Sequence, residues 1–186
     1  MKTLSILPAL ETAGLIIREI ARADWRGLAR FMTGKDYQRH ITMRLKNATD
    51  VKAFVARNVS RQDDARRNVF HLVAESRETG DVIGDGFIIF HRQNAVEIGW
   101  GLAPDFWGRG FGTEIGEALL GLAFERLHVE ECWSKVMAAN AASARLARRI
   151  GMDHVKSQAD YPTGGGRFGP VDMFKLTREG YFNRPY

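Results

Sequence analysis

The fold is decided by one stretch of the sequence, EIGWGLAPDFWGRGFGT, which spans residues 97–113. A strand pattern leads into a glycine-rich turn, and the turn opens a long helical pattern. Such a turn points several unpartnered backbone N–H groups at one place, with the positive end of the helix dipole behind them. Because Gly108, Gly110 and Gly112 carry no side chains, an anion can approach the backbone closely. The stretch therefore predicts a phosphate-binding site.

The surroundings of this turn argue against two common kinds of phosphate site. A phosphate-loop NTPase has a lysine followed by serine or threonine after the last glycine, whereas Gly112 is followed by Thr113 and Glu114. A dinucleotide-binding turn follows the first strand of a βαβ unit, whereas this turn follows several strands with short connections. Both alternatives are disfavoured.

Hydrophobic periodicity elsewhere predicts a mixed α/β (α+β) domain with an antiparallel meander before the turn. Strands are expected at residues 15–20, 69–75, 82–90, 96–102, 132–138, 152–156 and 171–176. Helices are expected at residues 25–32, after Asp50, at residues 115–127 and at residues 142–150. Asp24 is the expected N-cap of the first helix, and Gly151 is the expected C-cap of the last. We divide the chain into an N-terminal extension (1–13), the domain (14–180) and a C-terminal tail (181–186).

Composition is that of an ordinary globular protein. The chain has 186 residues, of which 45% are hydrophobic and 26% charged, so a single domain with its own core is expected. Cys132 is the sole cysteine, which excludes an internal disulfide and favours a small buried side chain in a reducing cytoplasm. We expect neither a signal peptide nor a membrane-spanning segment.

The positive charge of the chain suits an anionic partner. The formal charge is +5, and part of it comes from arginine clusters at residues 57–67 and 145–149. Neither cluster has the interleaved aromatic residues that stack on bases. We interpret both clusters as solvated helix faces, so nucleic-acid binding is disfavoured.

Two motifs in order resemble the cofactor-binding motifs of the GNAT N-acetyltransferase superfamily. The first is Arg109-Gly-Phe-Gly112 after the strand, and the second is Asn140-Ala-Ala-Ser143 followed by RRIGM at residues 148–152. The form WGRGFGTE at residues 107–114, joined to Asn-x-x-Ser, is similar to the RimJ/RimL branch in particular. Many members of the superfamily have Gln or Arg in place of Trp107, but an aromatic residue there also looks like this branch. The resemblance extends from about residue 15 to residue 176.

The resemblance implies a single GNAT domain whose mixed, mostly antiparallel sheet splays around acetyl-CoA, the co-substrate, with no metal. It implies acetyl transfer in a ternary complex to a primary amine, either a protein N-terminal α-amine or a small-molecule amine. Pantetheine would pair with the strand at residues 100–102, where Gly99 and Gly101 leave one face without bulk. The implied acetyl-CoA-binding residues are Trp100, Gly101, Leu102, Trp107, Gly108, Arg109, Gly110, Phe111, Gly112, Thr113, Asn140 and Ser143. A homodimer is compatible with this picture, and a membrane partner is not expected.

Two residues are candidates for proton transfer, each with a structural alternative. Glu97 shares a strand face with Gly99 and Gly101 and could deprotonate the incoming amine, or it could form a structural salt bridge. Ser143 could protonate the departing CoA thiolate, and Asn140 could bind the pantetheine arm, as the resemblance implies. Alternatively, both could cap the helix that they precede.

Specificity for the acceptor is expected in two places. Relatives usually form the acceptor pocket from the region that here contains Tyr37, Arg39 and His40, and the glycine-rich segment 161–169 is expected to be a mobile loop beside the cleft. The other histidines, including His71, are expected to be structural or exposed. Two other functions stay open: an acyl-CoA-binding sensor without catalysis, which would need neither Glu97 nor Ser143, and a basic nucleic-acid-binding module.

Overall fold

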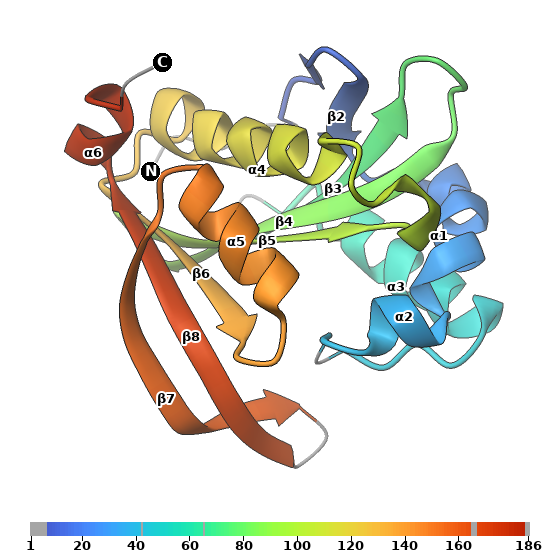
Figure 1. Ribbon diagram of the computed structural model, residues 1–186. Helices are drawn as coiled ribbons and strands as arrows, with labels where there is room; N and C mark the ends of the chain where they lie inside the picture. Colours follow the sequence, from blue (N-terminus) through green and yellow to red (C-terminus); the bar gives the residue numbers. More distant parts are fainter. Residues whose placement is uncertain (1–6, 42, 65, 165–166, 185–186) are drawn as a thin grey trace.

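The computed structural model describes residues 7–41, 43–64, 66–164 and 167–184, which form one eight-stranded sheet in the order β1-β2-β3-β4-β5-β6-β8-β7 (Figure 1). The strands are β1 (Leu10–Glu11), β2 (Leu15–Glu19), β3 (Val69–Ser76), β4 (Val82–Arg92), β5 (Ala95–Leu102), β6 (Glu131–Met137), β7 (Asp153–Gly164) and β8 (Arg167–Thr177). Neighbouring strands are antiparallel except for the pair β5–β6. The mixed, mostly antiparallel sheet and the meander of β3, β4 and β5 are thus confirmed.

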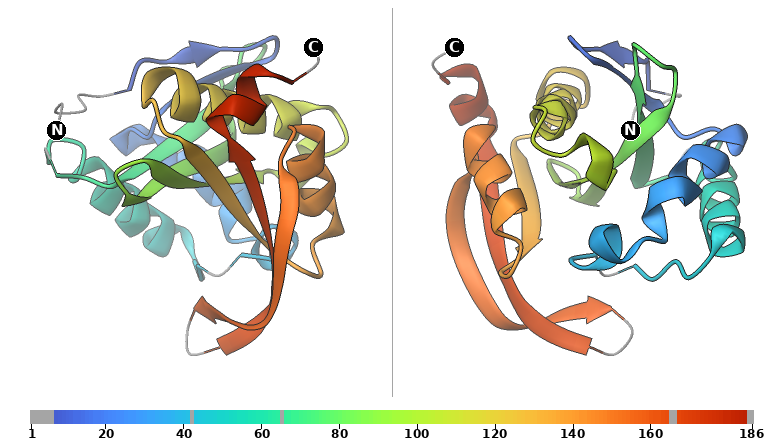
Figure 2. Two further views of the ribbon diagram at one scale, coloured as in Figure 1. Left: turned by 90° about the vertical axis from the view of Figure 1, so that its left-hand side faces the viewer. Right: turned by 45° about the vertical axis from the view of Figure 1, so that its right-hand side comes forward.

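The sheet splits at its one parallel pair. β5 and β6 pair only from Ala95 opposite Glu131 to Glu97 opposite Trp133, although β5 continues to Leu102 and β6 to Met137. In Figure 2 the β6–β8–β7 part turns away from the β1–β5 part. Beyond Glu97, the edge of β5 that faces β6 therefore has backbone groups that no strand in the described part of the chain pairs with.

Helices cover both faces of the sheet. On one face lie α4 (Phe111–Gly121), its π-helical continuation η3 (Leu122–Arg126) and α5 (Ala141–Arg149). On the other lie η1 (Arg22–Asp24), α1 (Trp25–Met32), α2 (Lys35–Gln38) and α3 (Ala48–Val59). The short η2 (Pro104–Phe106) follows β5, and α6 (Arg178–Phe182) follows β8.

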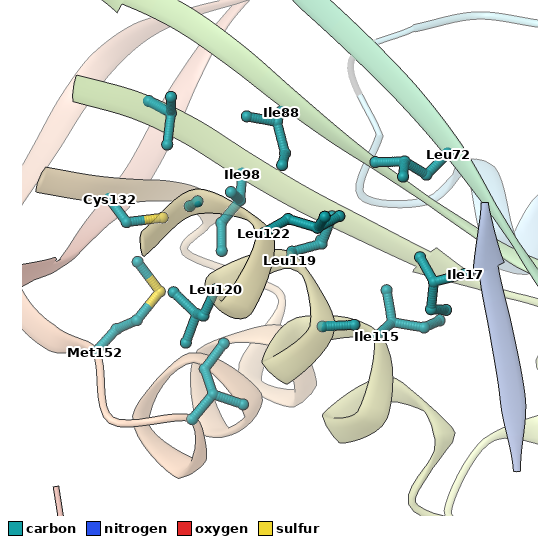
Figure 3. Packing of buried hydrophobic residues seen from close by; sticks show 14 of the residues in the cluster. Ile17, Leu72, Ile88, Ile98, Ile115, Leu119, Leu120, Leu122, Cys132 and Met152 are labelled. Carbon is teal, nitrogen blue, oxygen red and sulfur yellow. The ribbon is translucent and has the colours of Figure 1, made fainter. Parts of the chain in front are cut away.

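Each helical layer buries its own apolar core. Ile115 and Leu119 of α4 and Leu122 of η3 project onto the strand residues Ile88 and Ile98, as Figure 3 shows. The second core joins α1 and α3 to the opposite face of the sheet. Cys132 is fully buried in the first core, as expected, and burial raises the pKa of its thiol. In the described part of the chain no helix is long and apolar enough to span a bilayer.

The N-terminal segment packs onto the domain. β1 pairs with β2, and the buried Leu7 donates its backbone N–H to Glu19 Oε1 at 2.6 Å. Residues 7–13 therefore extend the sheet, and residues 1–6 lie outside the described part of the chain.

Asp24 does not cap α1, contrary to expectation. It is the last residue of η1, has helical φ and ψ angles, and makes no side-chain cap bond to α1. Its carboxylate instead accepts from the Ala21 N–H at 2.7 Å and binds Arg18 at 2.8 Å. Because η1 runs directly into α1, the helical segment begins at Ala21 and not at Asp24. The Asp24 carboxylate therefore binds the N–H group of Ala21 at the start of that segment.

The described residues of segment 161–169 belong to the paired strands β7 and β8, where a loop was expected. Tyr161 pairs with Gly169 and Pro162 with Phe168, so β7 and β8 extend well beyond the predicted strands. Irregular register after Gln158 and after Pro162 accommodates a proline that cannot donate to a regular ladder. Gly165 and Gly166 lie outside the described residues.

Candidate active site

A cleft of about 650 Å³ opens where β5 and β6 part. Its walls come from the end of β5, the turn at residues 107–113, the first residues of α5, and the segment 36–41 that contains α2. It brings together ten of the predicted acetyl-CoA-binding residues, namely Trp100, Gly101, Leu102, Trp107, Gly108, Gly110, Gly112, Thr113, Asn140 and Ser143. Arg109, Phe111 and Glu97 do not line it. A smaller hollow of about 410 Å³ between α1 and η2 contains none of the predicted site residues.

The turn before α4 has the geometry of an anion cradle. Gly108 and Gly110 have φ angles of +73° and +88°, a region that disfavours side chains. Gly110 is the N-cap of α4, and a Cβ atom built on it would have no neighbour within 4 Å. The space beside Gly110 at the N-terminus of α4 is therefore open, with the helix dipole behind it, and this arrangement suits a phosphate.

Gly112 serves a different purpose from the one expected. A Cβ atom on Gly112 would lie 2.7 Å from Leu146 Cδ1 of α5, not in open space. This glycine allows α4 and α5 to approach one another, and that approach forms one wall of the cleft. Gly112 also lines the cleft, as expected, so its missing side chain leaves room both for Leu146 and for a ligand.

Aromatic residues fix both ends of the turn. The exposed Trp107 donates its indole N–H to the Leu102 carbonyl at 2.9 Å, which ties the turn to the end of β5. The Arg109 guanidinium lies over the rings of Phe106 and Phe111, at 5.4 and 5.3 Å from their centres. Arg109 is therefore held beside the cleft by cation–π contacts.

Glu114, which no sequence pattern singled out, anchors the start of α4. Its carboxylate accepts from the Thr12 hydroxyl at 2.5 Å and from the Gly14 N–H at 2.8 Å. The segment between β1 and β2 thus holds the helix end that forms the cradle. A glutamate is common in the first turn of a helix because the helix dipole favours a negative charge there. Its position in the sequence therefore does not indicate that it binds Thr12 and Gly14.

Asn140 and Ser143 occupy the start of α5 as both interpretations require. Asn140 Oδ1 accepts from the Ser143 N–H at 3.1 Å, so the capping interpretation is confirmed for Asn140. Both residues also line the cleft. Arg145 and Arg149 line it one and two turns further along α5, so this arginine cluster faces the ligand site as well as solvent.

Glu97 is held by a lysine and a histidine. Its Oε2 lies 2.5 Å from Lys135 Nζ and 2.7 Å from His91 Nε2. Burial alone would lower the pKa of Lys135, but its contacts with Glu97 and Tyr161 outweigh this effect and raise the pKa. Because Glu97 does not line the cleft, the salt-bridge interpretation is favoured.

Gly99 and Gly101 do not leave a bare face for the ligand, contrary to expectation. A Cβ atom on Gly99 would collide with the Phe87 ring, and one on Gly101 would collide with Asp85 and Tyr37. The glycines therefore make room for side chains of β4 and α2. This face of β5 is therefore occupied by protein side chains.

Three buried polar residues form a connected group below Gly101. Tyr37 donates its hydroxyl proton to Asp85 Oδ1 at 2.5 Å, and His71 Nε2 lies 3.0 Å from Asp85 Oδ2. Tyr37 lines the cleft as expected, together with Arg39 and His40. Sequence analysis missed Asp85, although an acidic residue between Gly84 and Gly86 in an apolar strand is a signal that could have identified it.

A split sheet with an anion cradle at a helix N-terminus, and one cleft that extends from it to the polar segment 36–41, is the arrangement of acyl-CoA-dependent N-acyltransferases. Residues 14–153 match the family described as "Acetyltransferase (GNAT) domain", and the chain belongs to this family. The protein is an acetyl-CoA-dependent acetyltransferase. In the described part of the chain, no group of three or more His, Cys, Asp or Glu residues is arranged to hold a metal ion.

Similar proteins agree with this assignment. The chain is 25% identical over 143 residues to the Bacillus subtilis protein named uncharacterized N-acetyltransferase YnaD, a match that covers 77% of this chain and 81% of the relative. The structure of a GNAT-family acetyltransferase from Bacillus anthracis has a similar fold, with a TM-score of 0.82, 17% identity, and coverage of 92% of this chain and 99% of the other. Spermidine N-acetyltransferase from Vibrio cholerae, solved with CoA and spermine, has a TM-score of 0.78 at 16% identity, with coverage of 92% and 100%.

Proposed function

We propose that this protein transfers the acetyl group of acetyl-CoA to a primary amine by direct attack within a ternary complex. The observation that carries the proposal is the continuity of the cleft, since the anion cradle at Gly110 and the polar segment 36–41 line the same space. An acyl-CoA bound along β5 and an amine beside α2 would therefore meet without a covalent enzyme intermediate. Holding the two reactants together removes much of the entropic cost of a bimolecular step.

Each wall of the cleft has a task in this proposal. The N–H groups at the start of α4 bind the pyrophosphate, with positive charge from Arg145 and Arg149 nearby. The unpaired edge of β5 beyond Glu97 pairs with pantetheine, and Asn140 contacts the same arm. A backbone N–H within residues 100–102 stabilises the oxyanion that forms on attack. Ser143, which lines the cleft, supplies a proton to the leaving thiolate.

The charges in the acceptor half favour an amine with a single positive charge. Asp36 and Arg39 pair with each other at 2.9 Å, and burial followed by the nearby Arg39 lowers the pKa of His40. Asp36 is the only acidic residue among the described residues of the cleft wall. A polyamine would bring several ammonium groups to a pocket without the carboxylates to neutralise them. We therefore favour a peptide α-amine or a small monoamine, as the motif at residues 107–114 of the RimJ/RimL type also suggests.

Thiol release tests the proposal directly. The purified chain is mixed with acetyl-CoA and a panel containing short peptides with free N-termini, monoamines, spermidine and aminoglycosides, and free CoA is measured with a thiol reagent. We expect release with peptides or monoamines, an acetylated product by mass spectrometry, and a much lower rate with spermidine. Tight CoA binding without release on any amine would contradict catalysis. A preference for spermidine would contradict the electrostatic argument alone.

A further inference from the structure

A buried carboxylate lies directly beneath the strand that would hold the thioester. Asp85 of β4, His71 of β3 and Tyr37 of α2 are 5%, 9% and 6% exposed. The distances are 2.5 Å from the Tyr37 hydroxyl to Asp85 Oδ1 and 3.0 Å from His71 Nε2 to Asp85 Oδ2. Two neighbouring strands and the distant helix α2 thus meet around one carboxylate.

The partners of this carboxylate are unusual for a structural role alone. Buried acids are normally paired with lysine or arginine, and among the described residues Asp85 forms no ion pair with either. Its partners are a hydroxyl and an imidazole, both groups that can exchange protons. The His71 ring is packed against Phe54 at 4.7 Å and stacked on Phe87 at 6.5 Å, which fixes its orientation.

Tyr37 connects this group to the cleft. Tyr37 and Gly101 both line the cleft, and any side chain at position 101 would displace both the Tyr37 hydroxyl and the Asp85 carboxylate. Burial, and then the charge of Asp85, raise the pKa of Tyr37 well above its ordinary value, so the phenol keeps its proton. That proton is donated to Asp85. The lone pairs of the hydroxyl oxygen are therefore what Tyr37 can offer to an N–H donor in the cleft.

We propose that Tyr37 accepts the proton of the acceptor amine, with Asp85 as the final proton acceptor and His71 as the residue that positions Asp85. The amine first gives one proton to solvent, because an ammonium has no lone pair with which to attack. As the neutral nitrogen forms its bond to the thioester carbon, the carbonyl π pair moves onto oxygen, one N–H bond breaks, and its proton moves to the Tyr37 oxygen. The proton already on that oxygen passes to Asp85 Oδ1, which becomes a neutral acid. The carbonyl then re-forms, the C–S bond breaks, and the Ser143 hydroxyl gives its proton to the thiolate. As product departs, Asp85 returns its proton to solvent through Tyr37, and Ser143 regains a proton from solvent.

This inference rests on the proposed acetyl transfer and replaces the base that the sequence suggested. Glu97 is paired with Lys135 and His91 and does not line the cleft. Tyr37 does line it and already has a carboxylate behind its hydroxyl. The competing explanation is that the three residues only lock α2 onto the sheet, and the experiment below separates the two.

The first variant is Tyr37→Phe, which keeps the ring and removes the hydroxyl. We expect kcat to fall roughly a hundredfold or more, the range in which positioned proton transfer contributes, while the Kd for acetyl-CoA stays within twofold. The matched control is Tyr181→Phe, because Tyr181 donates to Glu125 at the same distance of 2.5 Å but does not line the cleft. This control should leave kcat unchanged.

Variants of the other two residues test the relay behind Tyr37. Asp85→Asn keeps the shape and the hydrogen-bond acceptor but removes the proton acceptor, and kcat should fall as in Tyr37→Phe, with the thermal transition of the fold retained. His71→Gln keeps an N–H donor toward Asp85 and should recover most of the kcat that His71→Phe loses. Such a recovery would show that His71 acts by holding the Asp85 carboxylate in place and not only by filling space.

The outcomes are separable. If the wild-type chain releases no free CoA with any amine of the panel, the proposed function fails, and the proton relay fails with it. If the wild-type chain is active and Tyr37→Phe, correctly folded, keeps the wild-type kcat, the relay is wrong while acetyl transfer stands. If Asp85→Asn keeps wild-type kcat while Tyr37→Phe loses it, Asp85 is not the proton acceptor and the inference is overturned in that form.

Discussion

Replacing Gly110 with alanine distinguishes the role of the turn in phosphate binding from its role in stability. Gly110 has a φ angle of +88°, and a Cβ atom there would meet no atom within 4 Å. Alanine in this left-handed conformation costs roughly 1–2 kcal/mol of stability. For a chain of this length, a loss of 1 kcal/mol corresponds to about 2–4 °C in Tm. The variant should therefore fold, with a Tm a few degrees below that of the wild type.

The effect on the ligand should be larger and specific. The added methyl group would stand in the open space in front of the first N–H groups of α4, where the pyrophosphate is proposed to bind. Loss of one hydrogen bond to a charged group costs roughly 1.5–3 kcal/mol, which corresponds to about a 10- to 100-fold increase in Kd. Isothermal titration should show this loss for CoA and none for pantetheine, which lacks the pyrophosphate.

The chain supplies a matched control in Gly80. This glycine has a φ angle of +72°, has no atom within 4 Å of a built Cβ, and lies in the turn between β3 and β4, away from the cleft. Gly80→Ala should lower Tm by a similar amount and leave the Kd for CoA unchanged. The cradle would be refuted if Gly110→Ala weakened CoA and pantetheine equally, or weakened neither.

Three further substitutions test the remaining assignments. Gly112→Val should cost about 1–3 kcal/mol by overpacking against Leu146, visible as a lower Tm, and an unchanged Tm would contradict the close approach of α4 and α5. Ser143→Ala should lower kcat more than it weakens acetyl-CoA binding, since the proton is needed only as the C–S bond breaks, and a wild-type kcat would leave Ser143 without a role in proton transfer. Glu97→Gln should leave the pH–rate profile of kcat unchanged and cost at most about 1 kcal/mol of stability through its contact with Lys135; loss of the acidic limb would instead restore Glu97 as the base.

Features that depend on neighbours in the sequence were predictable. The meander follows from alternating patterns with short turns between them, and the cradle follows from a strand, a glycine turn and a helix in immediate succession. The cap at Asn140 and the positive φ of +85° at Gly151 are likewise local. In each case the residues that determine the structure lie within one turn of the feature.

Features that depend on distant partners were not predictable. Nothing near Gly112 in the sequence indicates that Leu146 packs against it, and nothing near Glu97 indicates that Lys135 holds it. The length of the β7–β8 hairpin escaped prediction because irregular register allows proline and glycine within paired strands. Periodicity carries no information about such pairing.

Three glycines in β5 and the following turn are each required for a different structural reason. Gly110 is needed for its φ angle, Gly112 for the contact of two helices, and Gly101 for the bond between Tyr37 and Asp85. The sequence presents all three as one motif. Tyr37 lines the cleft together with Gly101, and a Cβ atom on Gly101 would collide with both Tyr37 and Asp85. The strand that would bind the thioester therefore has Tyr37, the proposed proton acceptor, packed against it. A side chain at position 101 would push the Tyr37 hydroxyl away from the reacting nitrogen even if acetyl-CoA still bound. Gly101→Ala should then lower kcat while leaving the Kd for CoA nearly unchanged, and a variant that lost CoA affinity but kept kcat would show that this glycine serves the cofactor and not the proton.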